Sequence, residues 1–286
     1  MLTRRSLFSA AALSSLAAAC SPLQALNGLN RLVPGDGGVR QPVDGAAYGS
    51  DPRQRLDVWA PKRATGKLPV IVFFYGGSWN SGRREDYGFA ARALSARGFV
   101  VVVPDYRLVP QVRWPAFVDD GAAAVQWVLA NIAAHGGDPA RVSVMGHSAG
   151  AHIAMLLALD RRWGVADGIK AGVGLAGPYD FLPFTAGGAA DAALGNAADL
   201  AETQPIHFAR KGAPPLLLLH GSKDTTVLPR NSQRLANAIT DLGGRAEVRI
   251  YPEVTHIGIV LALSKPFRGK AGALGDASAF LQRTLA

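Results

Sequence analysis

Six short apolar runs, separated by helix-length segments, constrain the fold of this chain more than any other feature. They begin about 30 to 45 residues apart, at Val70–Phe74, Phe99–Val103, Val142–Met145, Ala171–Leu175, Leu216–Leu219 and Ala246–Tyr251. Most of them are apolar on both faces, as strands covered by helices on each side must be. The runs therefore predict the strands of a largely parallel sheet.

The segments between these runs carry helical periodicity. In one segment Val118, Ala122, Val125, Leu129 and Ile132 recur at spacings of four and three residues, which places them on one face of a helix. Helices that connect parallel strands by right-handed crossovers give an open, doubly wound α/β sheet. We expect one such domain over residues 51–286, after a tether and lead-in over residues 21–50 that is rich in Gly, Pro and Asn.

The composition excludes several classes of protein. Hydrophobic residues make up 49% of the 286 residues, too many for an intrinsically disordered chain. No apolar stretch reaches about 18 residues, so the sequence predicts no transmembrane helix. The 30 Lys and Arg outnumber the 21 Asp and Glu, but they are scattered and form no basic stripe. We therefore expect no nucleic-acid partner, and the sequence leaves the oligomeric state open.

Residues 1–20 have the pattern of a signal peptide. Arg4 and Arg5 precede an apolar run over residues 7–19, which only serines interrupt, and no acidic residue occurs before Asp36. A basic start followed by a short apolar stretch is typical of export signals, and it is too short for a stable membrane span. We therefore expect an exported protein.

Two further patterns refine this expectation. Thr3-Arg4-Arg5-Ser6-Leu7-Phe8 resembles a twin-arginine signal. Cys20, the only cysteine, follows Leu16-Ala17-Ala18-Ala19, which resembles a bacterial lipoprotein signal. Ala17 stands where that signal usually has Leu, and the three alanines also fit an ordinary cleavage site. We expect a bacterial protein that is either periplasmic or anchored to a membrane by a lipid on Cys20.

The motif Gly146-His147-Ser148-Ala149-Gly150 has the form G-x-S-x-G. A β run precedes it and an Ala/Leu-rich helical segment, Ala151–Leu159, follows it. Glycines on both sides allow a tight strand-to-helix turn, which lifts the serine hydroxyl above the sheet and places it at a helix N-terminus. This context predicts Ser148 as a nucleophile.

A serine hydroxyl needs a base to accept its proton. His256 follows the last predicted strand, and the carboxyl ends of parallel strands line the active crevice of an open α/β sheet. His147 and His152 lie beside the serine, where the turn would aim them into packing, and His220 ends a strand, where a buried hydrogen-bonding role fits better. We therefore predict His256 as the base.

The histidine in turn needs an orienting carboxylate. Asp224 follows the Leu216–Leu219 run, so it too lies at a strand carboxyl end. The order Ser148, Asp224, His256 is the one that an α/β-hydrolase requires. Asp180, which follows the preceding strand, is the alternative that we weigh against Asp224.

Acyl transfer also requires donors for the developing oxyanion. The Gly-Gly turn after Val70–Phe74 allows backbone N–H groups to point at a substrate oxygen. We predict that Gly77, Ser78 and Ala149 form this oxyanion hole. Tyr75 and Trp79, which flank the turn, are expected to contact the substrate.

From about Arg55 onward, the chain resembles an α/β-hydrolase of the esterase/lipase group related to hormone-sensitive lipase and kynurenine formamidase. The resemblance rests on Tyr75-Gly76-Gly77-Ser78-Trp79, Asp105-Tyr106-Arg107-Leu108, the G-x-S-x-G motif, His220-Gly221-Ser222-Lys223-Asp224 and His256. That group usually has a loop-supporting His where this chain has Tyr75. The resemblance also implies that Asp105, Arg107 and the Asp119-Asp120 pair are structural.

These features predict a serine hydrolase that cleaves carboxylic esters through an acyl-enzyme, with a small-molecule ester as substrate. We expect no metal and no organic cofactor. The segment between the fourth and fifth apolar runs is short and has few bulky apolar residues, so we expect short acyl groups to be preferred. Two alternatives remain: an amide hydrolase like kynurenine formamidase, and a catalytically silent binding module.

Overall fold

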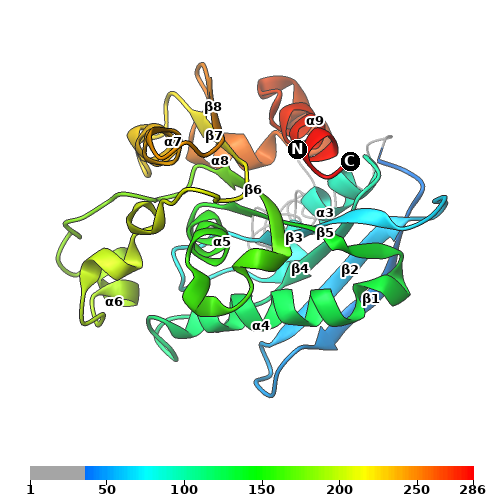
Figure 1. Ribbon diagram of the computed structural model, residues 1–286, viewed down its shortest axis with the longest axis horizontal. Coiled ribbons are helices and arrows are strands. Elements are labelled where there is room, and N and C mark those ends of the chain that lie inside the picture. The colour runs from blue at the N-terminus through cyan, green and yellow to red at the C-terminus, as the bar shows by residue number, and fades with distance from the viewer. Residues whose placement is uncertain (1–35) are drawn as a thin grey trace, which may run out of the picture.

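A single eight-stranded sheet runs through residues 36–286, the part of the chain that the computed structural model describes (Figure 1). The strands are β1 (Val39–Ala47), β2 (Arg55–Pro61), β3 (Leu68–Phe74), β4 (Val100–Pro104), β5 (Gly137–His147), β6 (Ile169–Leu175), β7 (Leu216–Gly221) and β8 (Ala246–Tyr251). Their order across the sheet is β1-β2-β4-β3-β5-β6-β7-β8. β2 pairs antiparallel with β1 and β4, and every pair from β4 to β8 is parallel. The mostly parallel sheet that the apolar runs predict is confirmed.

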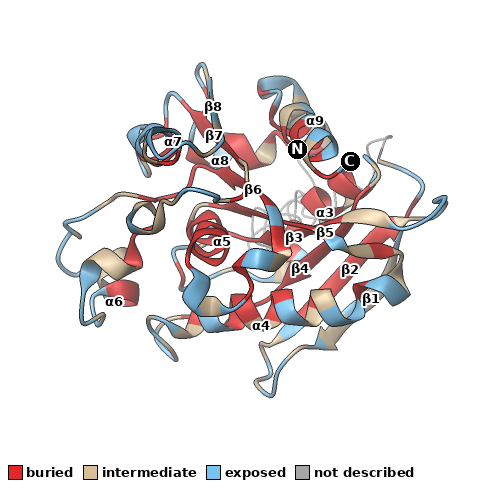
Figure 2. Cartoon of the chain, in the orientation of Figure 1, coloured by how far each residue is buried: buried red, intermediate tan, exposed pale blue. Residues whose placement is uncertain are grey.

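Helices cover both faces of this sheet. The α-helices of the described residues are α3 (Gly88–Ser95), α4 (Ala116–Asn131), α5 (Ala149–Leu159), α6 (Ala189–Leu194), α7 (Arg230–Asp241), α8 (His256–Leu261) and α9 (Ala273–Thr284). α6 lies to one side, away from the sheet (Figure 1). α3 packs with α9 on one face, and α4 packs with α5 on the other (Figure 1). Every residue of α5 is buried (Figure 2), as expected for an apolar helix at the centre of a layered domain. Among the described residues, no helix is both long enough and apolar enough to cross a membrane.

The sheet begins earlier in the chain than the sequence predicts. The expected tether over residues 21–50 contains β1, which pairs along its length with β2. Most β1 positions are only half-buried, and its register shifts twice, so this edge strand lacks the continuous apolar run of a central strand. The domain boundary therefore lies before Val39 and not at residue 51. The proposed signal peptide and Cys20 lie outside the described residues.

Three strand ends on one edge of the sheet position the chemistry. β5 ends at His147, directly before Ser148. β7 ends at Gly221 and β8 at Tyr251, shortly before Asp224 and His256. Because parallel strands finish at the same edge, residues more than 100 positions apart in the chain meet there.

Candidate active site

Ser148 lies at a strained turn between β5 and α5. Its backbone φ is 54° and its ψ is −123°, a left-handed conformation that costs a non-glycine residue about 1–3 kcal/mol. The surrounding structure holds the turn in place, because the Ser148 N–H donates to the Leu175 carbonyl of β6 at 2.9 Å.

The two glycines of the motif are required by close backbone contacts. A Cβ atom on Gly146 would lie 2.3 Å from the Gly150 carbonyl oxygen. A Cβ atom on Gly150 would lie 2.2 Å from the carbonyl oxygen of Phe74, at the end of β3. Since real Cβ atoms do not come this close, the tight turn needs glycine at both positions.

Ser148, His256 and Asp224 form one chain of hydrogen bonds. His256 Nε2 lies 2.9 Å from Ser148 Oγ, and His256 Nδ1 lies 2.7 Å from Asp224 Oδ2. His256 is the first residue of α8, and the Thr255 side chain caps that helix by accepting from the Gly258 N–H. Asp224 is 2% exposed and His256 9%, so solvent reaches the imidazole but hardly touches the carboxylate. The structure thus brings together the three side chains that the sequence singles out.

Asp224 is held as a carboxylate by several donors. The N–H groups of Thr226 and Val227 each donate to its Oδ1 at 2.9 Å. Burial raises the pKa of Asp224, but hydrogen bonds from His220, His256 and Val227 outweigh burial and hold that pKa well below its usual range. Asp180, the alternative carboxylate, instead pairs with Arg234 at 2.8 Å.

The predicted oxyanion loop lies against the nucleophile. A Cβ atom on Gly76 would lie 3.0 Å from Ser148 Cβ, so the loop backbone passes beside the serine. Gly77 and Ser78 adopt positive φ angles of 135° and 52°. No hydrogen bond within residues 36–286 uses the N–H of either residue, so both donors are available. Ala149 is the first residue of α5, where the helix leaves its N–H without an intrahelical partner.

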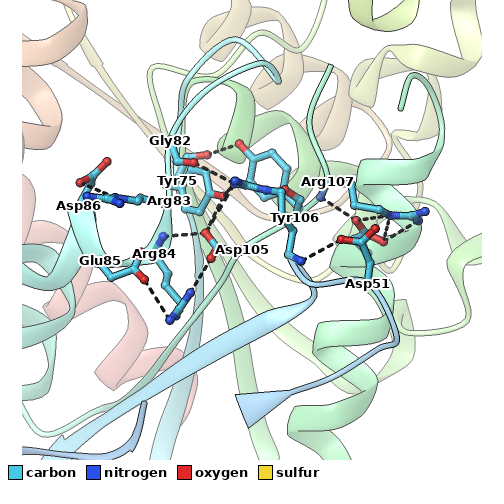
Figure 3. A network of polar contacts seen from close by, with 12 residues as sticks. Asp51, Tyr75, Gly82, Arg83, Arg84, Glu85, Asp86, Asp105, Tyr106 and Arg107 are labelled. Atoms are coloured by element: carbon cyan, nitrogen blue, oxygen red, sulfur yellow. Dashed lines mark hydrogen bonds and ion pairs between the residues drawn. The ribbon is translucent and has the colours of Figure 1, made fainter. Parts of the chain in front are cut away.

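Tyr75 does not lie where the sequence predicts. Its side chain is fully buried, and its hydroxyl donates to Asp105 Oδ1 at 2.9 Å (Figure 3). The same hydroxyl accepts from Arg53 Nη2 at 2.9 Å. Its ring stacks on Tyr106 at 4.6 Å between centroids. The prediction that Tyr75 contacts the substrate is therefore wrong, because neighbouring side chains enclose it beneath the loop.

Charged side chains continue the support beneath the oxyanion loop. Arg84 bonds both Asp105, at 2.7 Å, and Asp57, at 2.8 Å. Arg107 forms a bidentate pair with Asp120, which is 1% exposed. These contacts give Asp105, Arg107 and Asp120 the structural positions that the resemblance implies, whereas Asp119, the other member of the implied pair, is exposed.

Trp79 belongs to an aromatic cluster instead of standing free. It is 4% exposed, stacks with Phe181 at 6.4 Å and meets the edge of His152 at 5.2 Å. Phe184 extends the cluster from Phe181 at 5.4 Å. Phe181 and Phe184 come from the segment after β6, so residues from two crossovers form one apolar wall.

Two buried histidines contact the chain of hydrogen bonds in ways that the sequence does not reveal. His147 Nε2 donates to the His256 carbonyl oxygen at 3.0 Å, and burial lowers the pKa of His147 to about 3. His220 has the buried hydrogen-bonding role expected of it, but one of its partners is Asp224. The only sequence signal for these two histidines is that each lies at the end of a strand. That position does not identify their hydrogen-bond partners.

A cavity of about 590 Å³ opens beside Asn80 of the oxyanion loop. Polar and apolar side chains both line it: residues 51–53, Asn80 and residues 107–112. None of the clustered aromatic residues lines this cavity. Within the described residues, no group of three or more His, Cys, Asp or Glu side chains could hold a metal ion.

Comparison with known proteins places the chain in a family. Residues 56–239 match the family described as BD-FAE. Isoprenylcysteine alpha-carbonyl methylesterase ICME of Arabidopsis thaliana is 32% identical over 80% of this chain and 59% of its own length. Esterase LipC of Mycobacterium tuberculosis is 34% identical over 63% of this chain and 50% of its own length. The chain thus spans little more than half the length of these relatives.

Solved structures agree on the fold. A truncated carbohydrate esterase from gut microbiota superposes with a TM-score of 0.77, at 21% identity, over 88% of this chain and 98% of its own. An esterase B from Lactobacillus rhamnosis gives 0.76, at 21% identity, over 96% of both chains. Together with the eight-stranded sheet and the family match, these likenesses show that the chain belongs to the BD-FAE family, within the esterase/lipase group of the α/β-hydrolases.

Proposed function

We propose that this protein is a serine hydrolase that cleaves carboxylic esters. The observation that carries the proposal is the continuous chain of hydrogen bonds from Ser148 through His256 to Asp224, at a strained strand-to-helix turn. The relatives named above as esterases support the same reaction class. Because this chain spans only part of their length, the activity is inferred from its own site.

The geometry supports a two-step acyl transfer. Ser148 Oγ attacks the ester carbonyl carbon while His256 Nε2 takes the hydroxyl proton. The imidazolium that forms is stabilised by Asp224, which faces its Nδ1–H. The N–H groups of Gly77, Ser78 and Ala149 stabilise the oxyanion. His256 then gives its proton to the leaving alcohol, and water, activated by the same base, releases the acid.

We further propose that the aromatic wall limits the acyl group. The Trp79–Phe181 stack is packed within 6.4 Å, and Phe184 closes against Phe181. A long acyl chain gains about 0.8 kcal/mol per buried CH₂, but only where an extended apolar tunnel exists. α6 has only six residues and adds no such tunnel. Short acyl groups, acetyl to about hexanoyl, fit this wall best.

The cavity beside Asn80 is the proposed place for the alcohol part of the ester, because Asn80 lies two positions after the oxyanion donor Ser78. Its lining combines polar side chains, among them Asp51 and Asn80, with apolar ones such as Leu108. An alcohol that carries both hydroxyl groups and apolar surface suits this mixed lining.

Export remains part of the proposal. The Arg4-Arg5 pair and the apolar run before Cys20 support a signal peptide that directs the protein to the periplasm or, with lipid on Cys20, to a membrane. An exported location also disfavours kynurenine formamidase activity, because the substrate of that enzyme family arises in the cytoplasm.

Comparison of wild type with Ser148→Ala tests the function. Nitrophenyl esters from C2 to C16 and formylkynurenine are the substrates, and a fluorophosphonate probe reports on the serine. We expect the highest kcat/KM at C2 to C6, and loss of both turnover and labelling in Ser148→Ala without loss of folding.

Three other results would contradict parts of this proposal. Formylkynurenine as the best substrate would establish the amide hydrolase. Wild-type protein that neither turns over esters nor reacts with the probe would establish the silent binding module. A maximum at C12 or longer would show that the aromatic wall does not limit the acyl group.

A further inference from the structure

Asp224 makes a side-chain contact that the reaction proposed above does not use. His220 Nε2, near the end of β7, lies 3.2 Å from Asp224 Oδ2, and both side chains are fully buried. The same oxygen faces His256 Nδ1 at 2.7 Å, while Oδ1 accepts from the N–H groups of Thr226 and Val227. Three hydrogen bonds and the longer approach of His220 Nε2 thus surround the two oxygens of the carboxylate.

The partners of His220 determine which of its nitrogens carries the proton. Nε2 lies 2.8 Å from the Val227 carbonyl oxygen, which can only accept. Nδ1 lies 2.8 Å from the hydroxyl of Ser232, a fully buried residue of α7 that can donate. The ring proton therefore sits on Nε2, where it is hydrogen-bonded to the Val227 carbonyl and has Asp224 Oδ2 as a second, longer neighbour at 3.2 Å. The Ser232 hydroxyl holds Nδ1 as an acceptor.

We propose that His220 is a positioning residue: its Nε2–H holds Asp224 Oδ2 toward His256, and Ser232 keeps the proton on Nε2. The inference rests on the proposed function, since it concerns the carboxylate that orients the base. The donor on Oδ2 also stabilises the negative charge of that oxygen, so the proton between Asp224 and His256 stays on the imidazole. In keeping with this, the His220 contact helps to hold the pKa of Asp224 low against the opposing effect of burial.

A purely structural role is the rival reading. The shorter contact of His220 Nε2 is with the Val227 carbonyl, and that contact alone would close the turn between β7 and α7. The two roles differ in their effect on the pH dependence of catalysis. Loss of a donor on Asp224 makes the carboxylate more basic and stabilises the His256 imidazolium, whereas loss of a turn contact lowers the rate equally at every pH.

The groups around Asp224 allow this effect to be isolated. The titratable side chains that face it are His220 on β7 and His256 on α8, with His147 of β5 behind His256. Burial keeps the pKa of His147 at about 3, so it stays uncharged in the range of the assay. Lys223 and Glu253 pair with each other at 3.6 Å on the exposed side of the loop.

The experiment compares His220→Leu, His220→Gln and Ser232→Ala in the full chain. Gln can place an N–H near the position of Nε2, whereas Leu fills similar space without a donor. Ser278→Ala is the matched control for Ser232→Ala, because Ser278 is also a buried helical serine but donates to Leu274 within α9. Thermal unfolding checks that each variant is folded, and kcat and KM for nitrophenyl acetate are measured from pH 5 to 9.

We expect His220→Leu to lower kcat about ten- to a hundredfold with little change in KM. The acid limb of its kcat/KM profile should move upward by roughly 0.5–1 pH unit. His220→Gln should recover most of the wild-type kcat. Ser232→Ala should lower kcat about three- to tenfold and move the acid limb in the same direction as His220→Leu. Ser278→Ala should match wild type in both kcat and acid limb. An acid limb that does not move in any His220 or Ser232 variant would overturn the proposal, as would a Gln variant no better than Leu.

A second measurement separates this inference from the proposed function. The far-downfield proton NMR resonance of His256 Nδ1–H reports on the bond to Asp224 and needs no substrate. We expect the resonance to shift in His220→Leu and Ser232→Ala and to return toward the wild-type position in His220→Gln. An unchanged resonance would refute the contact even in an active enzyme, whereas a shifted one would support it even if wild type hydrolysed no ester.

Discussion

Replacing Tyr75 by Phe tests whether the buried network beneath the oxyanion loop positions that loop. The Tyr75 hydroxyl bridges the Asp105 carboxylate and the Arg53 guanidinium at 2.9 Å each, and its side chain is fully buried. Hydrogen bonds to charged groups contribute about 1.5–3 kcal/mol, and Asp105 keeps its contacts with Arg84 after the change. We therefore expect unfolding free energy to fall by about 2 kcal/mol.

The effect on catalysis follows from the position of the loop. Tyr75 precedes Gly76, whose backbone passes next to Ser148, so a shift of the tyrosine moves the donors on Gly77 and Ser78. Loss of one oxyanion donor typically lowers the rate about 10²–10³-fold, and a displaced donor costs less. We expect kcat for nitrophenyl acetate to fall about tenfold while KM stays nearly constant.

Urea unfolding and steady-state kinetics measure both quantities. Tyr251→Phe is the matched control, because its hydroxyl also donates to a carboxylate, Asp276 of α9, at 2.6 Å. The control should lose stability but keep kcat. A raised KM with unchanged kcat in Tyr75→Phe would refute the reasoning, because it would mean that Tyr75 contacts the substrate. An unchanged unfolding free energy would show that the hydroxyl does not support the loop.

Three other predictions follow from the site and its surroundings. Asp224→Asn should lower kcat by orders of magnitude because His256 loses its orienting carboxylate, whereas Asp180→Asn should not; a larger loss in the latter would reverse the assignment. Burial lowers the pKa of His147 to about 3 and of His152 to about 4, against about 6.5 unfolded, so the unfolded chain binds more protons below pH 6.5. Urea unfolding should show that the unfolding free energy decreases as the pH is lowered below that point, by up to about 2.7 kcal/mol per pH unit for the two histidines together. His152→Gln should make this pH dependence less steep. An equally steep pH dependence in wild type and variant would exclude His152 as a source. Cys20→Ser should release the protein from the membrane fraction if the cysteine carries lipid, and equal fractionation of variant and wild type would favour simple cleavage.

Local sequence was sufficient for the central strands and for the nucleophile. Strands β3 to β7 contain apolar runs between helical segments, and β8 alternates apolar with charged residues. Each of the six appears in the structure within a few residues of its predicted start or end. Ser148 was equally accessible, because G-x-S-x-G between a strand and a helix specifies a turn whose glycines leave no room for a Cβ. The apolar runs and the contact between Gly146 and Gly150 depend on near neighbours in the chain, whereas Gly150 is required by the backbone at the end of β3.

The positions of His256 and Asp224 after strand ends predict their pairing, but not the residues that surround them. Parallel topology places loops that follow β7 and β8 at one edge, which makes the pairing predictable. Two strands are not predicted by the apolar runs. β1 is largely half-buried and lacks a continuous apolar run, and Asp57 interrupts the run of β2. The position of Tyr75 beside a Gly-Gly turn does not reveal which way its side chain points.

Which buried polar groups form hydrogen bonds with each other depends on the tertiary structure alone. Tyr75 contacts Asp105 and Arg53, and His220 contacts Asp224 and Ser232. In both cases the partners come from other segments of the chain. The physical reason is that a buried donor or acceptor must be satisfied, yet the sequence does not say by which partner. That choice depends on the packing of side chains from distant segments, and it is made when the sheet and its helices close around them.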